Sequence, residues 1–154
     1  MGLAFRDLHR AETDLAREFR RVAHRHAAEA DVFHLCLRFA EQCDRHAATL
    51  VGAGGRYGEQ LHPEPVRPPL AGPARARRAV RPVEEGPVLL AHLRALSTLA
   101  HECEISWTVI GQGAMAHRDD ELAAQVHACG TETAVQGQWL RTRLEEAAPQ
   151  VLSG

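Results

Sequence analysis

Lysine is missing from this sequence, and several marks of common protein classes are missing with it. All 18 basic residues are arginine, which indicates a G+C-rich bacterial genome, because arginine codons are richer in G and C than lysine codons. The formal net charge is only −2, so the chain as a whole lacks the bias toward polyanions of a strongly basic domain. No apolar run reaches the ~18 residues of a membrane-spanning helix.

Targeting and catalytic motifs are missing as well. The amino terminus, MGLAFRDLHRAETDL, has neither the apolar core nor the cleavage site of a secretory signal, so we expect a cytoplasmic protein. The sequence contains no CxxC pair, P-loop, dinucleotide-binding fingerprint, nucleophile elbow or HExxH motif. In a reducing compartment the cysteines are expected to be buried thiols rather than disulfides. They are Cys36, Cys43, Cys103 and Cys129.

The composition favours a single all-α domain. Aromatic residues make up only 5% of the 154 residues, whereas alanine and leucine are abundant, so the interior should consist of small and aliphatic side chains on helices. Helical periodicity predicts helices at about 3–28, 31–51, 87–111 and 120–148. A tight turn is expected near AAEAD, with Asp31 capping the second helix, and Asp119 or Asp120 should cap the fourth. We expect Gly52, Gly111 and Pro149 to mark helix ends.

The predicted inner faces are regular. In the first helix the seam is Leu8, Glu12, Leu15, Phe19, Val22 and His26. In the second it includes Phe33, Cys36, Phe39, Cys43, His46 and Leu50. The third should bury Leu89, Leu93, Leu96, Ala100, Cys103, Trp107 and Ile110, and the fourth Leu122, Val126, Cys129, Thr133, Gln136 or Gly137, Leu140 and Leu144.

The connection 52–86 has a different composition. It holds six of the 12 glycines and six of the 8 prolines, which predicts a long irregular segment. It is either a crossover that runs the length of a bundle or a flexible insertion. Arg75, Arg77, Arg78 and Arg81 could bind an anionic partner, although a solvated linker, partly neutralised by Glu84 and Glu85, is the simpler interpretation.

Together these features describe an antiparallel four-helix bundle with a long crossover between helices two and three. The stretches VAHRHAAEADVFHLCLRFAEQCDRHAATL, SWTVIGQGAMAHRDDELAAQVHACGTET and QWLRTRLEEAAPQVL resemble the ferritin-like superfamily, and more narrowly a group of bacterial ferritin-like proteins. The resemblance covers nearly the whole chain except the Pro/Gly-rich connection. It implies that helices two and three run parallel.

Di-iron members of that superfamily carry a Glu on each of two helices and Glu-x-x-His on the other two. Glu12 matches the Glu of a first helix, and Glu102, Glu104 and Glu132 lie on helices three and four, but no Glu-x-x-His occurs on the second or the fourth helix. The ligand set is incomplete, so we expect no ferroxidase or oxygenase activity.

One candidate site follows from depth in the bundle. Residue numbers add to a constant at one level of a hairpin, which places Glu12 level with His46, and Cys103 level with Cys129. If helices two and three run parallel, as the resemblance implies, the two pairs share one layer. Carboxylate, imidazole and thiolate groups in one layer are ligands that suit Zn²⁺, with iron as the alternative metal. Glu104 and Glu132 are weaker candidate ligands.

A simpler hypothesis explains the same seam. Glu12 and His46 would form a buried polar pair that fixes helix register, with the cysteines as small apolar residues. Under it the protein is a binding or scaffolding bundle without catalysis; the alternative is a metal-binding bundle. His101 and Glu104 have chelating spacing, but the other outlying histidines should face solvent. They are His9, His62, His92 and His117. Trp139, Leu140 and Leu144 suggest a surface for a homodimer.

Overall fold

A computed structural model describes residues 1–63 and 84–154 of the chain. Within these ranges the backbone forms helices and no strands, which confirms the all-α class. The helices are α1 (Gly2–Arg25), α2 (Ala30–Arg56), α3 (Glu85–His117) and α4 (Asp120–Leu152).

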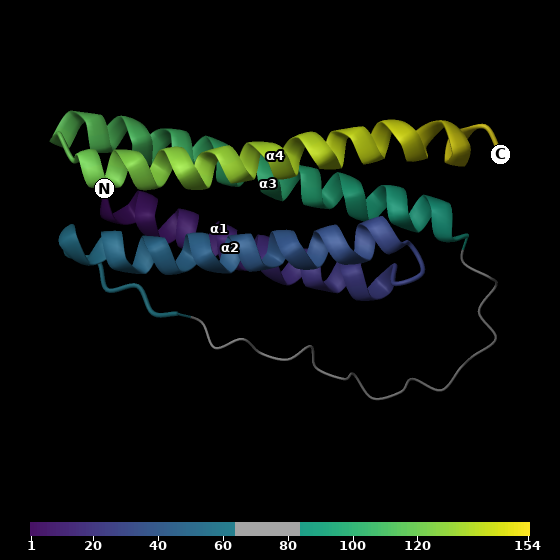
Figure 1. The fold of residues 1–154 in the computed structure, drawn as a ribbon, viewed down its shortest axis with the longest axis horizontal. Helices are drawn as coiled ribbons and strands as arrows, with labels where there is room; N and C mark the ends of the chain where they lie inside the picture. The colour runs from purple at the N-terminus through teal and green to yellow at the C-terminus, as the bar shows by residue number, and fades with distance from the viewer. Residues whose placement is uncertain (64–83) are drawn as a thin grey trace.

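The helices form two hairpins that lie against each other (Figure 1). One hairpin consists of α1 and α2, the other of α3 and α4, and across the bundle α1 contacts α3 while α2 contacts α4. At one end Arg25, the last residue of α1, donates to Glu85 at the start of α3. At the other end the hydroxyl of Tyr57, just after α2, donates to Asp119 in the turn before α4 over 2.8 Å.

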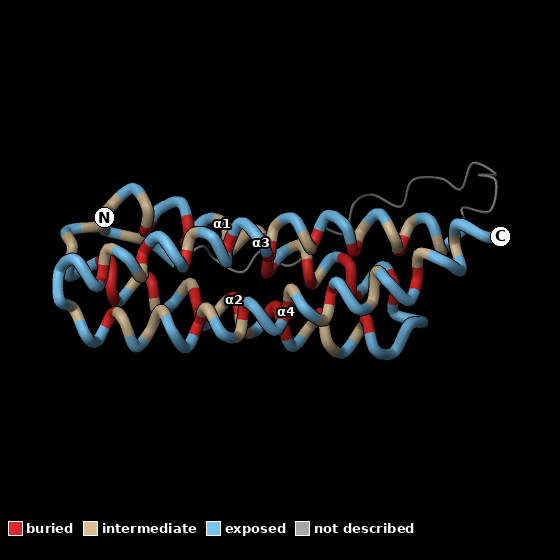
Figure 2. The backbone as a smooth tube through the Cα atoms, turned by 90° about the horizontal axis from the view of Figure 1, so that it is seen from above, coloured by how far each residue is buried: buried red, intermediate tan, exposed pale blue. Residues whose placement is uncertain are grey.

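The predicted inner faces point into the core. Figure 2 shows the buried positions turned toward the space between the helices and the exposed positions turned outward. Every residue predicted for the seams of α1 and α3 is buried, including the polar Glu12 and His26. On α2 and α4 most are buried, while Phe33, Val126 and Leu144 are half-buried and pack against the core. Amphipathic periodicity alone therefore predicted which side of each helix is buried.

The predicted helix ends were less accurate, because glycine did not stop two of the helices. Gly52 and its neighbours lie inside α2, and Gly111 and Gly113 lie inside α3. A helical glycine costs only about 1 kcal/mol relative to alanine, and close packing offsets that cost. A Cβ on Gly54 would lie 3.2 Å from Leu61, and one on Gly113 would overlap Met1.

Three other boundary predictions were also wrong. Helix α3 begins at Glu85 rather than at Pro87, and α4 continues past Pro149 for less than a turn. Asp31 does not cap α2: it lies in the first turn and accepts from Arg143 of α4 at 2.9 Å. Asp119 does cap α4, since its side chain accepts from the backbone N–H of Leu122.

Part of the predicted connection falls outside the described residues. Arg75, Arg77, Arg78 and Arg81 belong to that part, so the cluster proposed for an anionic partner is not placed here. Among the residues that are described, no helix has both the length and the apolar character needed to cross a membrane.

Alanine substitutions can check that α2 continues through its glycines. A Cβ added at Gly52 or Gly55 meets nothing within 4 Å, so either change should stabilise the fold by about 0.5–1 kcal/mol in urea unfolding. Gly58, with φ of +76°, is the control, because alanine there should destabilise by about 1 kcal/mol. A loss of stability in Gly55→Ala would show that α2 ends earlier.

Candidate functional site: a buried glutamate–histidine network

Glu12 on α1 and His46 on α2 face each other in the core. Their side chains are 0% and 2% exposed, and Nδ1 of His46 lies 3.2 Å from Oε1 of Glu12. The contact confirms the prediction that the two residues are level in the hairpin. The seam of each helix turns these polar residues inward with their apolar neighbours, so they must satisfy each other there.

Trp107 on α3 joins the same carboxylate oxygen. Its indole N–H donates to Oε1 of Glu12 over 2.6 Å, and its ring meets the His46 ring edge-on at 5.8 Å and 86°. Glu12 thereby connects the two hairpins through one atom. The sequence predicted that Trp107 is buried but did not predict this hydrogen bond. The one signal for it was that a buried indole N–H usually has an acceptor.

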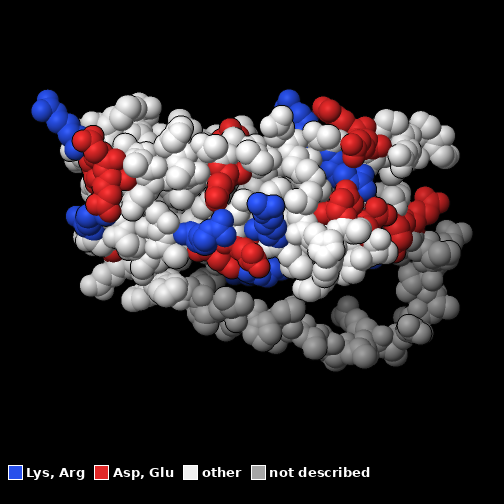
Figure 3. All heavy atoms as spheres, in the orientation of Figure 1, with Lys and Arg blue, Asp and Glu red and all other residues white. Residues whose placement is uncertain are grey.

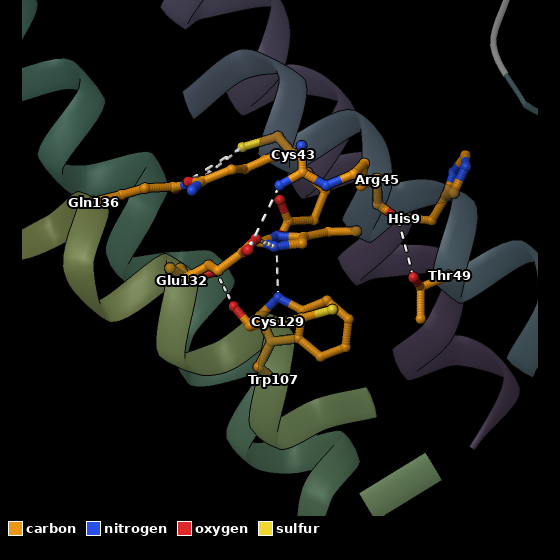
Figure 4. A network of polar contacts seen from close by, with 12 residues as sticks. His9, Cys43, Arg45, Thr49, Trp107, Cys129, Glu132 and Gln136 are labelled. Carbon is orange, nitrogen blue, oxygen red and sulfur yellow. Dashed lines mark hydrogen bonds and ion pairs between the residues drawn. The ribbon is translucent and has the colours of Figure 1, made fainter. Parts of the chain in front are cut away.

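Glu132 on α4 completes the network from the opposite side of the imidazole. Its Oε2 lies 2.8 Å from Nε2 of His46, and its Oε1 lies 3.5 Å from Arg45. The Glu132 side chain is 40% exposed, so the network reaches the surface. Figure 4 shows Trp107, Glu132 and Cys43 converging from different helices on the space between them.

The two glutamates stabilise the charged form of His46. Burial of the ring opposes protonation most strongly, but the hydrogen bonds and charges of Glu12 and Glu132 together outweigh it and raise the pKa of His46. As an imidazolium the ring donates from Nδ1 to Glu12 and from Nε2 to Glu132. The site is therefore a cation held between two carboxylates.

Glu12 has one oxygen that this network does not use. Oε2 is buried and has no hydrogen-bond partner among the residues that the structure describes. A buried acceptor without a partner carries a desolvation cost of about 1–3 kcal/mol. Glu12 is thus the least satisfied group of the network. An added cation or water molecule would bind to the network at Oε2 of Glu12.

Buried thiols surround the carboxylate. Burial raises the pKa of Cys43, Cys103 and Cys129, and the charge of Glu12 raises each further; for Cys129 the value is about 11. Gln136 contacts the sulfur of Cys43 and donates to Gln42 over 3.0 Å. At neutral pH these thiols keep their protons, which makes them poor nucleophiles and poor metal ligands.

The predicted ligands come together only in part. Glu12, His46 and Glu132 meet, whereas Glu104 lies on the exposed face of α3, 3.5 Å from His101. Glu12 and Glu132 occupy opposite nitrogens of one ring, so they do not converge on a common point. Within the described ranges no group of three or more His, Cys, Asp or Glu side chains has an arrangement that could hold a metal ion.

Two histidines predicted to face solvent do not. His9 is only 9% exposed, because the helical repeat that buries Leu8 and Glu12 also turns it toward the interior. His92 is half-buried and contacts His26. His62 and His117 are exposed as predicted, the latter lying against the ring of Tyr57.

Comparisons with protein-family models, with curated proteins and with solved structures found no match to the chain.

Substitution of Glu12 tests whether the pair is charged. We expect Glu12→Gln to destabilise by about 1–3 kcal/mol in urea unfolding, because the amide keeps the shape but removes the charge that faces the imidazolium. Once Glu12 is changed, His46→Gln should cost little more, since the two positions are coupled. Glu104→Gln is the matched surface control and should stay within about 0.5 kcal/mol.

The same variants should differ in their dependence on pH. A raised folded pKa of His46 adds stability that is complete below about pH 6.5 and is lost as pH rises through the folded value. In urea unfolding, the stability of the wild type should therefore decline as pH rises above about 6.5, and Glu12→Gln should make this decline smaller. A neutral or stabilising Glu12→Gln would mean instead that Glu12 is a protonated, merely tolerated acid.

Proposed function

We propose that this protein is a ferritin-like helical bundle that binds or scaffolds a partner through its exterior and does no redox catalysis. One observation carries the proposal: both nitrogens of His46 are occupied from opposite sides by Glu12 and Glu132. The polar centre of the bundle is thus engaged in its own contacts. Its role is to align α1, α2 and α4 rather than to offer a reactive group.

The arrangement of helix ends supports the ferritin-like part of the proposal. The start of α3 lies beside the end of α1, as the contact from Arg25 to Glu85 requires, whereas α2 ends beside the turn between α3 and α4. The end of α2 and the start of α3 thus lie at opposite ends of the bundle, which supports a crossover between them. A long crossover at this position is the topology of ferritin-like bundles.

A homodimer is the first partner we propose. The surface suggested by the sequence needs revision, because Leu140 is fully buried and Trp139 packs edge-on against Phe39 at 5.6 Å. The exterior of α3 instead exposes Ile105 and Val109, one turn apart and each more than half exposed. In Figure 3 basic and acidic side chains are interspersed with wide uncharged areas on the face seen there.

Light scattering tests the dimer. The wild type should have the mass of two chains at micromolar concentration, and the double change Ile105→Ser with Val109→Ser should give a monomer with unchanged helix content. Leu3→Ser, at an exposed position on α1, serves as the control and should leave the mass unaltered. A wild-type monomer would remove this partner from the proposal.

The second partner that we propose is an anionic molecule, which would bind the arginine cluster of the connection. Arg75, Arg77, Arg78 and Arg81 lie outside the described residues, so charge alone supports this part. Binding of a polyanion that weakens steeply with added salt would be the corresponding observation.

A metal-binding bundle is the alternative function, favoured by the unpartnered Oε2 of Glu12. Zn²⁺ or iron would draw on Glu12, His46, Cys103 and Cys129, with Glu104 and Glu132 as weaker candidates. Loading such a site would require thiols to lose protons that burial holds firmly, and His46 to give up one of its carboxylates.

Metal analysis separates the two functions. For a scaffold we expect less than stoichiometric Zn or Fe in the purified protein and no change of melting temperature on adding EDTA. A bound metal would give full occupancy, a lower melting temperature with the chelator, and loss of the metal in Cys103→Ser. The second set of results would show that the metal-binding function, and not the scaffolding function, is the correct one.

A further inference from the structure

Two histidines face each other at the end of the bundle where α1 finishes and α3 begins. His26 directly follows the last residue of α1 and is 4% exposed, while His92 lies in the second turn of α3 and is half-buried. Nε2 of His26 is 2.9 Å from Nδ1 of His92, and the rings meet edge-on at 5.1 Å and 68°. The contact joins the two hairpins.

This contact depends on the protonation state of the two rings. An imidazole–imidazole hydrogen bond needs an N–H on one ring and a lone pair on the other, so it exists when one ring or neither is charged. When both rings are imidazolium cations, two N–H groups face each other and two positive charges repel at close range. Double protonation therefore turns an attraction between α1 and α3 into a repulsion.

The surrounding charges do not cancel that repulsion. The acids that act on the two rings are Glu18, Glu29 and Glu85, and each already accepts from an arginine: Arg21, Arg143 and Arg25 respectively. Burial lowers the pKa of His26, and His92 and Arg25 lower it further against weaker effects of Glu85 and Glu29. Burial likewise lowers the pKa of His92, with Arg21 and Arg25 outweighing Glu18.

We propose that the His26–His92 contact is a pH-sensitive latch, which holds the start of α3 against the end of α1 at neutral pH and releases it in mildly acidic solution. The direction of the pH effect on stability follows from the lowered pKa values of His26 and His92. Such histidines add stability that is complete above about pH 6.5 and is lost as pH falls through their folded pKa values.

Release would be confined to one side of this end. Arg143 of α4 donates to Asp31 and Glu29 beside the α1–α2 turn, and neither of these contacts involves an imidazole. The α1–α2 turn therefore keeps its tie to α4 while the first turns of α3 separate from α1. A depression of about 310 Å³, lined by Arg25, Glu29 and Gly86 among others, adjoins the latch and would widen.

Hydrogen exchange can locate the release. The wild type is compared at about pH 7.5 and about pH 5.5 in the presence of EDTA, with rates corrected for intrinsic exchange. Amides in residues 88–93 should lose protection severalfold in acid, because protonation of the two rings favours the opened state. Amides around Trp107 should change much less. Equal changes in both regions, or none in either, would overturn the latch.

Removing the charge from one ring gives the matched variant. His92→Gln keeps a donor and an acceptor but cannot become cationic, so residues 88–93 should respond to acid less than in the wild type, with only His26 left to titrate. His101→Gln, at an exposed position of the same helix, should respond as the wild type does. An undiminished acid response in His92→Gln would overturn the proposal.

A measurement on the unaltered chain avoids dependence on folding of the variant. NMR titration of the imidazole rings should show His26 and His92 titrating below about pH 6.5, the ordinary value for histidine. The first turns of α3 should lose their native amide signals over the same range. Titration of both rings at or above about pH 6.5 would contradict the latch.

Discussion

A buried imidazolium between two carboxylates is the interaction on which the alignment of the helices depends. The imidazole of His46 lies on α2, and its partners Glu12 and Glu132 lie on α1 and α4. Trp107 of α3 joins the network because its indole N–H donates to the same oxygen of Glu12. Apolar seams tolerate sliding, because one leucine can replace another. A slide by one helical turn would strand Glu12 among aliphatic side chains at a cost of several kcal/mol, so this layer permits one register.

The sequence predicted the hairpin half of this network but not its other half. Glu12 and His46 lie on neighbouring helices joined by a short turn, so counting residues from the turn was enough to pair them. Trp107 and Glu132 come from the second hairpin, whose rotation and height depend on packing across the bundle. Residue counting carries no information on that packing, and Glu132 was therefore predicted only as a weak metal ligand.

Helix ends were hardest to predict for a related reason. Glycine lowers helix propensity wherever it occurs, yet Gly54 and Gly113 sit where Leu61 and Met1 approach the backbone closely. Contacts between distant parts of the chain outweighed a local preference of about 1 kcal/mol per residue. The inner faces were predicted well because burial repeats with the helical period over many residues, so single local exceptions have little effect.

The two ends of the bundle are fastened by different chemistry, and this gives the molecule a polarity. At one end Tyr57 and Arg56 hold Asp119 through a phenol and a guanidinium, and the hydrogen bond to Asp119 raises the pKa of the Tyr57 phenol above its ordinary value of about 10. At the other end two imidazoles face each other, and acid turns their attraction into repulsion. Acid should therefore loosen the bundle at one end only, in the first turns of α3, while the layer around His46 keeps its register.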